Sequence, residues 1–169
     1  MAPASSIATR NVARNAIIEA EIKQINDVEY SSKTARRWKH SIVAAAKNIP
    51  TKIAGAAGGY GHTYLVETTA QFHTQSVENA ASVTNPGGLT YSTGVPADSR
   101  STTMAQERTD HEVAVEAYRT QEGVTIGLRK AIIDSIPKEL IVELEDDDTF
   151  FDEVLPLDLI AAVMANATL

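Results

Sequence analysis

The chain contains no cysteine among its 169 residues, and few aromatic side chains. The missing cysteine excludes a disulfide framework, a zinc site built on thiolates and a cysteine nucleophile. Because aromatic residues make up only 5% of the chain while apolar types reach 43%, a core must be built mainly from Ile, Val, Leu and Ala. No apolar run approaches the ~20 residues that span a bilayer. We therefore expect an intracellular protein, cytoplasmic or nuclear, with no membrane partner.

The sequence also lacks the short motifs of common catalytic sites. The glycine-rich segment at residues 54–62 has no Lys-Ser/Thr pair after its glycines, as a phosphate-binding loop requires. There is no Gly-x-Ser-x-Gly elbow and no Asp-Ser/Thr-Gly protease signature, and the four histidines do not fall at zinc-ligand spacing. We therefore expect a protein that is not an enzyme, with no catalytic residue, cofactor, metal or small-molecule substrate.

Helical periodicity dominates the chain. Apolar side chains that recur every three to four residues predict helices over residues 11–28, 33–47, 70–76, 101–136, 138–144 and 156–165. Thr-Tyr-Leu-Val at residues 63–66 is a short strand candidate, so the predicted fold class is all-α with at most one β element near 63–67. Gly123 and Gly127 each weaken the long helix by roughly 1 kcal/mol relative to alanine. That helix is accordingly either bent or broken near residues 120–125.

Glycine and proline divide these helices into two groups. Residues 1–10, rich in Ser, Thr and Ala, are expected to be disordered. Residues 11–76 form a predicted N-terminal helical lobe that includes the Gly-rich loop 54–62. An Asn-Pro-Gly-Gly run and a later glycine and proline mark residues 77–98 as an extended connector. Residues 99–169 form the predicted C-terminal helical lobe.

The apolar faces of the predicted helices indicate the core. Trp38 shares a helical face with Ile42, and large aromatic side chains contribute heavily to burial. A second apolar row recurs at steps near 3.5 residues along the long helix, as in a seam packed against other helices. The expected core anchors are Trp38, Ile42, Tyr118, Leu128, Ile132, Ile136, Leu140, Leu159 and Ile160.

Charge is divided unevenly along the chain, whose net charge is −7. Residues 1–60 carry 9 Lys/Arg and 4 Asp/Glu (+5), whereas residues 61–169 carry 6 and 18 (−12). This polarity favours head-to-tail contact between copies or a basic end that meets an anionic partner; the alternative is solvated surface charge alone. The candidate contacts to RNA or phosphate are Arg36, Arg37, Lys39, Lys47 and Lys52.

Several short segments follow one another in an informative order. A helix that carries the tryptophan precedes Gly-Gly-Tyr-Gly-His at residues 58–62 and Asn-Pro-Gly at residues 85–87. A charged helix then leads into Leu-Arg-Lys-x-Ile-Ile at residues 128–133 and Ile-Pro-x-x-Leu at residues 136–140. Over residues 32–165 this order resembles the N-terminal Gag region of copia-type (Ty1/copia-like) retrotransposons. Such elements often carry a downstream Cys/His zinc knuckle for RNA, and this sequence has none.

The resemblance implies a helical, capsid-like structural protein that associates with itself into a virus-like particle, with RNA as a further partner. Our first hypothesis is self-assembly through apolar helix faces, helped by contact between the basic and acidic ends. A second hypothesis is a nucleic-acid-binding or scaffold adaptor that uses the basic helix within residues 33–52. A third is a small enzyme that uses the Gly-rich loop and His62.

Overall fold

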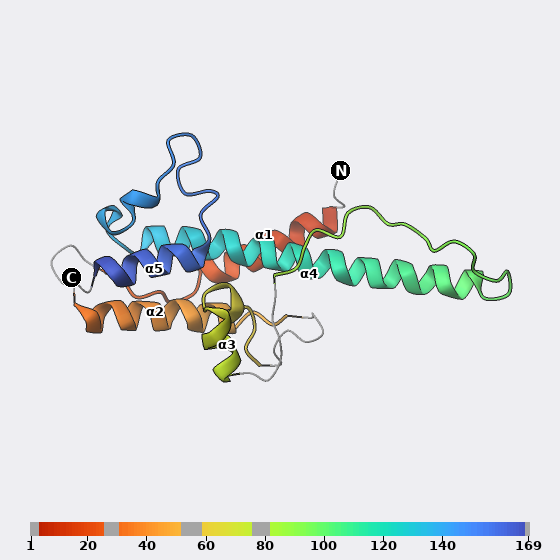
Figure 1. The fold of residues 1–169 in the computed structure, drawn as a ribbon, viewed down its shortest axis with the longest axis horizontal. Coiled ribbons are helices and arrows are strands. Elements are labelled where there is room, and N and C mark those ends of the chain that lie inside the picture. The colour runs from red at the N-terminus through yellow and green to blue at the C-terminus, as the bar shows by residue number, and fades with distance from the viewer. Residues whose placement is uncertain (1–3, 26–30, 52–58, 76–81, 168–169) are drawn as a thin grey trace.

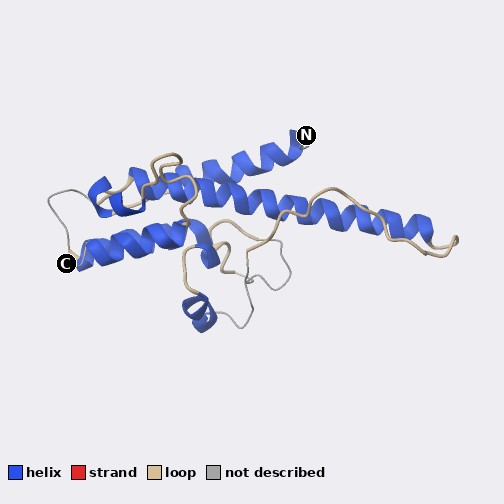
Figure 2. Ribbon diagram, turned by 45° about the horizontal axis from the view of Figure 1, so that its top comes forward, coloured by secondary structure: helices blue, strands red, loops and turns tan. Residues whose placement is uncertain are grey.

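The computed structural model describes residues 4–25, 31–51, 59–75 and 82–167. Regular structure in these residues is helical (Figure 2), apart from one isolated bridge between Asp146 and Phe150. The α-helices are α1 (Ala4–Ile18), α2 (Ser32–Lys47), α3 (Thr69–Gln75), α4 (Arg100–Asp134) and α5 (Pro156–Asn166). Three short 3-10 helices are η1 (Thr63–Leu65), η2 (Lys138–Leu140) and η3 (Val142–Leu144). The prediction of an all-α fold is confirmed.

The two halves of the chain share one hydrophobic core. Figure 1 shows α1 against the middle of α4, with α2 and α5 beside the C-terminal half of α4. Buried residues from both predicted lobes, such as Ile17 and Ile42 from the first and Leu128 and Leu159 from the second, belong to a single cluster. The predicted division into two lobes therefore does not correspond to two separate cores.

Two glycines allow α1 to lie directly against α4. A Cβ atom on Gly123 would lie 2.1 Å from the carbonyl oxygen of Arg10, and one on Gly127 would lie 2.8 Å from that of Arg14. Glycine lowers helix propensity, yet α4 is one continuous helix of 35 residues. The glycines that suggested a bend or break thus serve close packing between helices.

The N-terminal segment differs from its prediction at both ends of the helix. Residues 1–10 were expected to be disordered, but α1 already begins at Ala4, and it ends at Ile18 instead of residue 28. Beyond it, the Lys23 amide donates to Ser41 Oγ at 3.0 Å, and the Ile25 amide donates to the Ser135 carbonyl at 2.8 Å. These tertiary partners satisfy the backbone without a helix. Ile25 is buried nonetheless. The apolar pattern that includes Ile25 therefore predicted its burial correctly, although this residue is not in a helix.

The strand candidate at residues 63–66 is wrong. Thr63, Leu65 and Val66 donate their amides to carbonyls three residues back, which makes η1 a 3-10 turn. Strand preference depends on a neighbouring strand to pair with, and the described residues contain none beside this segment. Residues 138–144, predicted as one helix, likewise form the short turns η2 and η3.

Most of the expected core anchors are buried. Trp38 is fully buried, and its indole N–H donates to Ser135 Oγ at 2.7 Å. The other anchors that are buried are Ile42, Leu128, Ile132, Ile136, Leu140, Leu159 and Ile160. Tyr118 differs, because it is only half-buried and lines a surface groove.

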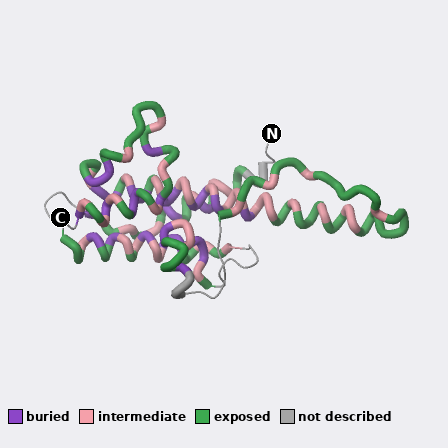
Figure 3. The backbone as a smooth tube through the Cα atoms, in the orientation of Figure 1, coloured by how far each residue is buried: buried purple, intermediate pink, exposed green. Residues whose placement is uncertain are grey.

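The described part of the predicted connector, residues 82–98, folds back along α4 instead of bridging two lobes. Figure 1 shows the green segment before α4 running beside the first half of that helix. We call residues 82–116 the arm. No residue in the α4 part of the arm is buried, and the buried positions of α4 begin at Ala117 (Figure 3). The arm therefore projects from the core as a helix, residues 100–116, with an extended segment beside it, residues 82–98, which we call the strap.

Candidate functional site

A basic groove lies along the exposed face of α2. It has a volume of about 670 Å³ and is lined by Lys23, Lys33, Arg36, Arg37, His40 and Ser41. The α2 residues recur at helical spacing, so their side chains share one face of the helix. Ser31 fixes the start of this helix, because its hydroxyl accepts the Thr34 amide at 3.2 Å.

Most charges of this groove have no carboxylate partner among the described residues. Lys23 Nζ lies 3.0 Å from a Glu21 carboxylate oxygen, so its charge is partly balanced. Arg36 Nε donates to the Ser32 carbonyl at 3.2 Å, which orients the guanidinium along the helix. Within the described residues, Lys33, Arg36 and Arg37 make no ion pair with a carboxylate. Several cations without carboxylate partners suit an anionic ligand, whether phosphate or carboxylate.

The structure brings together two of the five predicted phosphate contacts. Arg36 and Arg37 both line the basic groove. Lys39 is half-buried and does not line it. Lys47, at the end of α2, places its ammonium 5.5 Å from the centre of the Tyr60 ring. Lys52 lies outside the described residues.

Sequence reasoning missed Lys33, His40 and Lys23 as members of the groove. Lys33 and His40 lie four residues before and three residues after Arg37, so a helical projection of α2 places all three on one face. Lys33 and His40 could therefore have been found from the sequence. Lys23 could not be found in this way. It comes from a segment outside α2, and only the tertiary bond between its amide and Ser41 brings it there.

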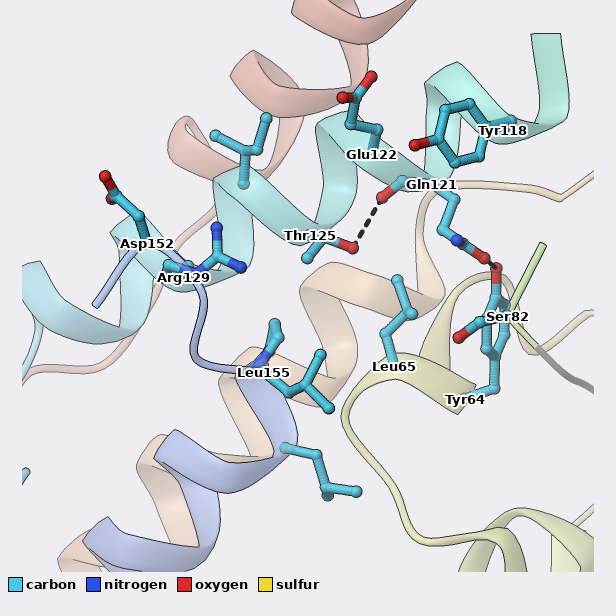
Figure 4. Close-up of a pocket in the computed structure, with 13 residues that line it drawn as sticks. Tyr64, Leu65, Ser82, Tyr118, Gln121, Glu122, Thr125, Arg129, Asp152 and Leu155 are labelled. Carbon is cyan, nitrogen blue, oxygen red and sulfur yellow. Dashed lines mark hydrogen bonds between the residues drawn. The ribbon is translucent and has the colours of Figure 1, made fainter. Parts of the chain in front are cut away.

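A second, larger groove of about 810 Å³ lies between η1, α4 and the start of α5. Figure 4 shows its centre, where the buried Gln121 side chain joins two distant segments. Gln121 Oε1 accepts from the Tyr64 hydroxyl and from the Val83 amide, each at 2.8 Å. Its Nε2 donates to the Val83 carbonyl at 3.0 Å. Gln121 therefore pairs with a backbone as a neighbouring strand would, and it anchors the strap.

Several polar groups of this second groove are engaged within the chain. Arg129 Nε donates to the Val154 carbonyl at 2.9 Å, and Glu122 pairs with Arg119 at 2.8 Å. Burial raises the pKa of Tyr64, whose hydroxyl is held by Gln121. Tyr64, Gln121, Glu122 and Arg129, which Figure 4 labels, thus support the fold through contacts within the chain.

The described part of the glycine-rich segment caps the end of α2. Gly61 has φ +54°, and a Cβ there would lie 2.3 Å from the Lys47 carbonyl oxygen. The His62 amide donates to the Ala46 carbonyl at 3.0 Å, and Nδ1–H donates to the Ile49 carbonyl at 2.7 Å. Burial lowers the pKa of His62, and the bond to Ile49 opposes that shift only in part. Residues 54–58 of the predicted loop lie outside the described residues.

Polar contacts hold the strap of the arm against α4. The Glu107 carboxylate accepts the Ser92 amide at 3.1 and 3.2 Å and also the Ser92 hydroxyl. His111 Nε2 bonds to the Gly87 carbonyl at 2.9 Å. The Gly87 amide, in turn, donates to Asn85 Oδ1, which shapes the Asn-Pro-Gly turn. The arm also carries the exposed apolar side chains of Tyr91, on the strap, and Val113, on α4.

Wider comparisons and searches add three findings. No family model, curated protein or solved structure matches the chain. Among the described residues, no three His, Asp or Glu side chains gather as metal ligands would. A search over the same residues finds no helix that combines the length and the apolar character of a membrane span.

Proposed function

We propose that this chain is a capsid-like structural protein of the Gag type that works by associating with copies of itself. The observation that carries this proposal is the arm, a long helix and strap that project from the core without burying a side chain of the helix between residues 100 and 116. This part of α4 lacks core packing, the source of most helical stability in proteins. An exposed projection with apolar side chains on it is suited to contact with another molecule.

The order of segments over residues 32–165 supports the same function. These segments make contacts that stabilise one fold. Gly61 and His62 cap the end of α2, and the Gly87 carbonyl of the Asn-Pro-Gly turn accepts a hydrogen bond from His111. The leucine and paired isoleucines of residues 128–133 lie on the core half of α4, where Leu128 and Ile132 are buried. A helical scaffold of the same kind would require these segments in the same order, which is why their resemblance to the Gag pattern supports the proposal.

Sedimentation velocity over a wide range of protein concentrations, with negative-stain imaging of the largest species, tests the proposal. We expect species larger than the monomer to grow with concentration. Val113→Asp, which places a charge on an exposed apolar side chain of the arm, should weaken association. Val12→Asp on α1 is the control, at a valine that is more exposed (70% against 45%) and lies outside the arm. A native chain that is monomeric at every concentration and ionic strength overturns the proposal.

A further inference from the structure

A compact turn at residues 145–150, which we call the acidic turn, presents carboxylates and an aromatic ring to solvent. The Asp146 amide donates to the Phe150 carbonyl at 2.8 Å, and the Phe150 amide donates back to the Asp146 carbonyl at 2.9 Å. The Asp146 carboxylate accepts the Asp148 and Thr149 amides, and these bonds hold the pKa of Asp146 below its usual range. Asp146 thus shapes the turn, while Asp147 and Asp148 point their charges outward.

Phe150 occupies an unusual position in this turn. It is the one residue other than glycine with a positive φ, +54°, among the described residues, and its side chain is 60% exposed. This conformation is costly for a bulky side chain, so the surrounding structure must impose it. Here the buried neighbour Phe151 anchors the chain in the core and the bridge to Asp146 closes the turn. The result is a large ring held outward beside two carboxylates.

Nothing nearby in sequence neutralises the acidic turn. From residue 139 to residue 169 the chain has nine Asp or Glu and no Lys or Arg. Asp147 and Asp148 make no side-chain hydrogen bond or ion pair with the rest of the described chain. The turn is consequently a negative, partly apolar projection without a cationic partner among the residues that the structure describes.

The basic groove on α2 has the complementary chemistry. Arg36 and Arg37 supply cations that lack carboxylate partners in the described structure, and the aliphatic stems of such side chains offer apolar surface for a ring. Figure 1 places the acidic turn and α2 on opposite sides of the core. One copy cannot bring the two surfaces together, but two copies can.

We propose that the acidic turn of one copy docks in the basic groove of the next copy. In this contact Asp147 and Asp148 face Arg36 and Arg37, and Phe150 packs on the stems of the groove. Because each copy carries both surfaces on opposite sides, the contact is head-to-tail and repeats into a closed ring or an open filament. The inference rests on the proposed function, self-association, and names one of its interfaces.

Complementary charge reversal tests this contact on the full chain, treated with nuclease and studied at low ionic strength. One variant carries Arg36→Glu and Arg37→Glu, and the other carries Asp147→Lys and Asp148→Lys. Each variant alone sets like charges against each other, so its dissociation constant for self-association should rise about tenfold or more. An equimolar mixture restores opposite charges at both contacts and should assemble again. Phe150→Ser should also weaken assembly while it leaves every charge in place.

Matched controls separate this contact from a general effect of net charge. Lys130→Glu with Lys138→Glu changes the net charge as much as the groove variant does, at exposed sites outside it, and should leave assembly unchanged. Fluorescence of the single tryptophan, Trp38, reports whether each variant retains its buried core. Loss of assembly in the control pair as well would overturn the specific contact.

The remaining outcomes distinguish the docking from the proposed function. A native chain that does not associate overturns both. A native chain that associates, with reversal variants that associate equally well or a mixture that does not recover, overturns the docking alone. If Arg36→Glu with Arg37→Glu abolishes binding of a labelled single-stranded RNA but not self-association, the groove is a nucleic-acid site and the docking is again overturned.

Discussion

The two halves of α4 lie in different surroundings although they belong to one helix. Residues 117–134 contain the buried positions of α4, including Val124, Leu128 and Ile132, which pack in the shared core. Residues 100–116 bury no side chain and contact the strap through polar groups such as Glu107 and His111. Core burial fixes the second half, whereas helix propagation and a few hydrogen bonds hold the first. The arm should therefore open locally long before the core unfolds.

Substitutions at the α1–α4 contact should have the largest effect. Gly123→Ala forces a methyl group to within 2.1 Å of the Arg10 carbonyl oxygen, a distance that requires α1 to move. We expect the free energy of unfolding in urea to fall by on the order of 3 kcal/mol or more. Gly88→Ala in the strap is the matched control, because a Cβ there meets nothing within 4 Å. Gly88→Ala should change the free energy of unfolding by less than about 0.5 kcal/mol. Equal losses in both variants would contradict the difference between the packed core and the exposed arm.

Loss of a polar contact inside the core should lower the free energy of unfolding more than loss of one on the arm. Ser135→Ala leaves the buried indole N–H of Trp38 without its acceptor at 2.7 Å. An unpaired buried donor costs about 1–2 kcal/mol, so we expect a loss of that size in urea unfolding followed by the fluorescence of Trp38. Ser101→Ala, at an exposed position of α4, provides the comparison and should be close to neutral. A neutral Ser135→Ala would show that the indole finds another acceptor.

The buried His62 should make core stability depend on pH. Burial lowers its pKa in the folded state below the unfolded value near 6.5, so below that pH the unfolded chain takes up the proton first. Stability should therefore be fully present above about pH 6.5 and decrease as the pH falls toward the folded-state pKa. His62→Asn, which keeps a donor near the Ile49 carbonyl, should flatten this dependence. Identical pH profiles for His62→Asn and the native chain would refute this assignment.

The smallest effect on overall stability should come from the strap. Glu107→Ala removes the acceptor of the Ser92 amide, so hydrogen exchange at that amide should accelerate. The free energy of global unfolding should change by less than about 0.5 kcal/mol, because the core does not depend on the strap. Glu112→Ala, an exposed neighbour without a contact to Ser92, is the control for a general effect on the helix. Unchanged exchange at Ser92 would mean that other contacts hold the strap.

The candidate groove shows how far local spacing predicts a site. Arg36 and Arg37 were identified from the basic character of their helix, and the structure places both in the groove. Lys39 had the same character but lies off this face, since the rotation of α2 is set by burial of Trp38 and Ile42. Lys47 lies at the end of α2, beside the Tyr60 ring, and so beyond the groove. Basic charge alone therefore predicts too many residues for a site on a helix. The prediction improves when the buried face of the helix is identified first.

The amino-acid sequence by itself determined the helical class, the aliphatic core and most helix ends, because these depend on periodicity and on neighbouring residues. The cap by Ser31 and the reciprocal bonds between Thr68 and Gln71 at the start of α3 are of this local kind. Only the tertiary structure decided that Gly123 seats α1, that residue Lys23 joins the basic groove, and that residues 63–66 form a turn. Each of these depends on a contact between segments far apart in the chain, and such contacts leave no periodic signal in either segment alone.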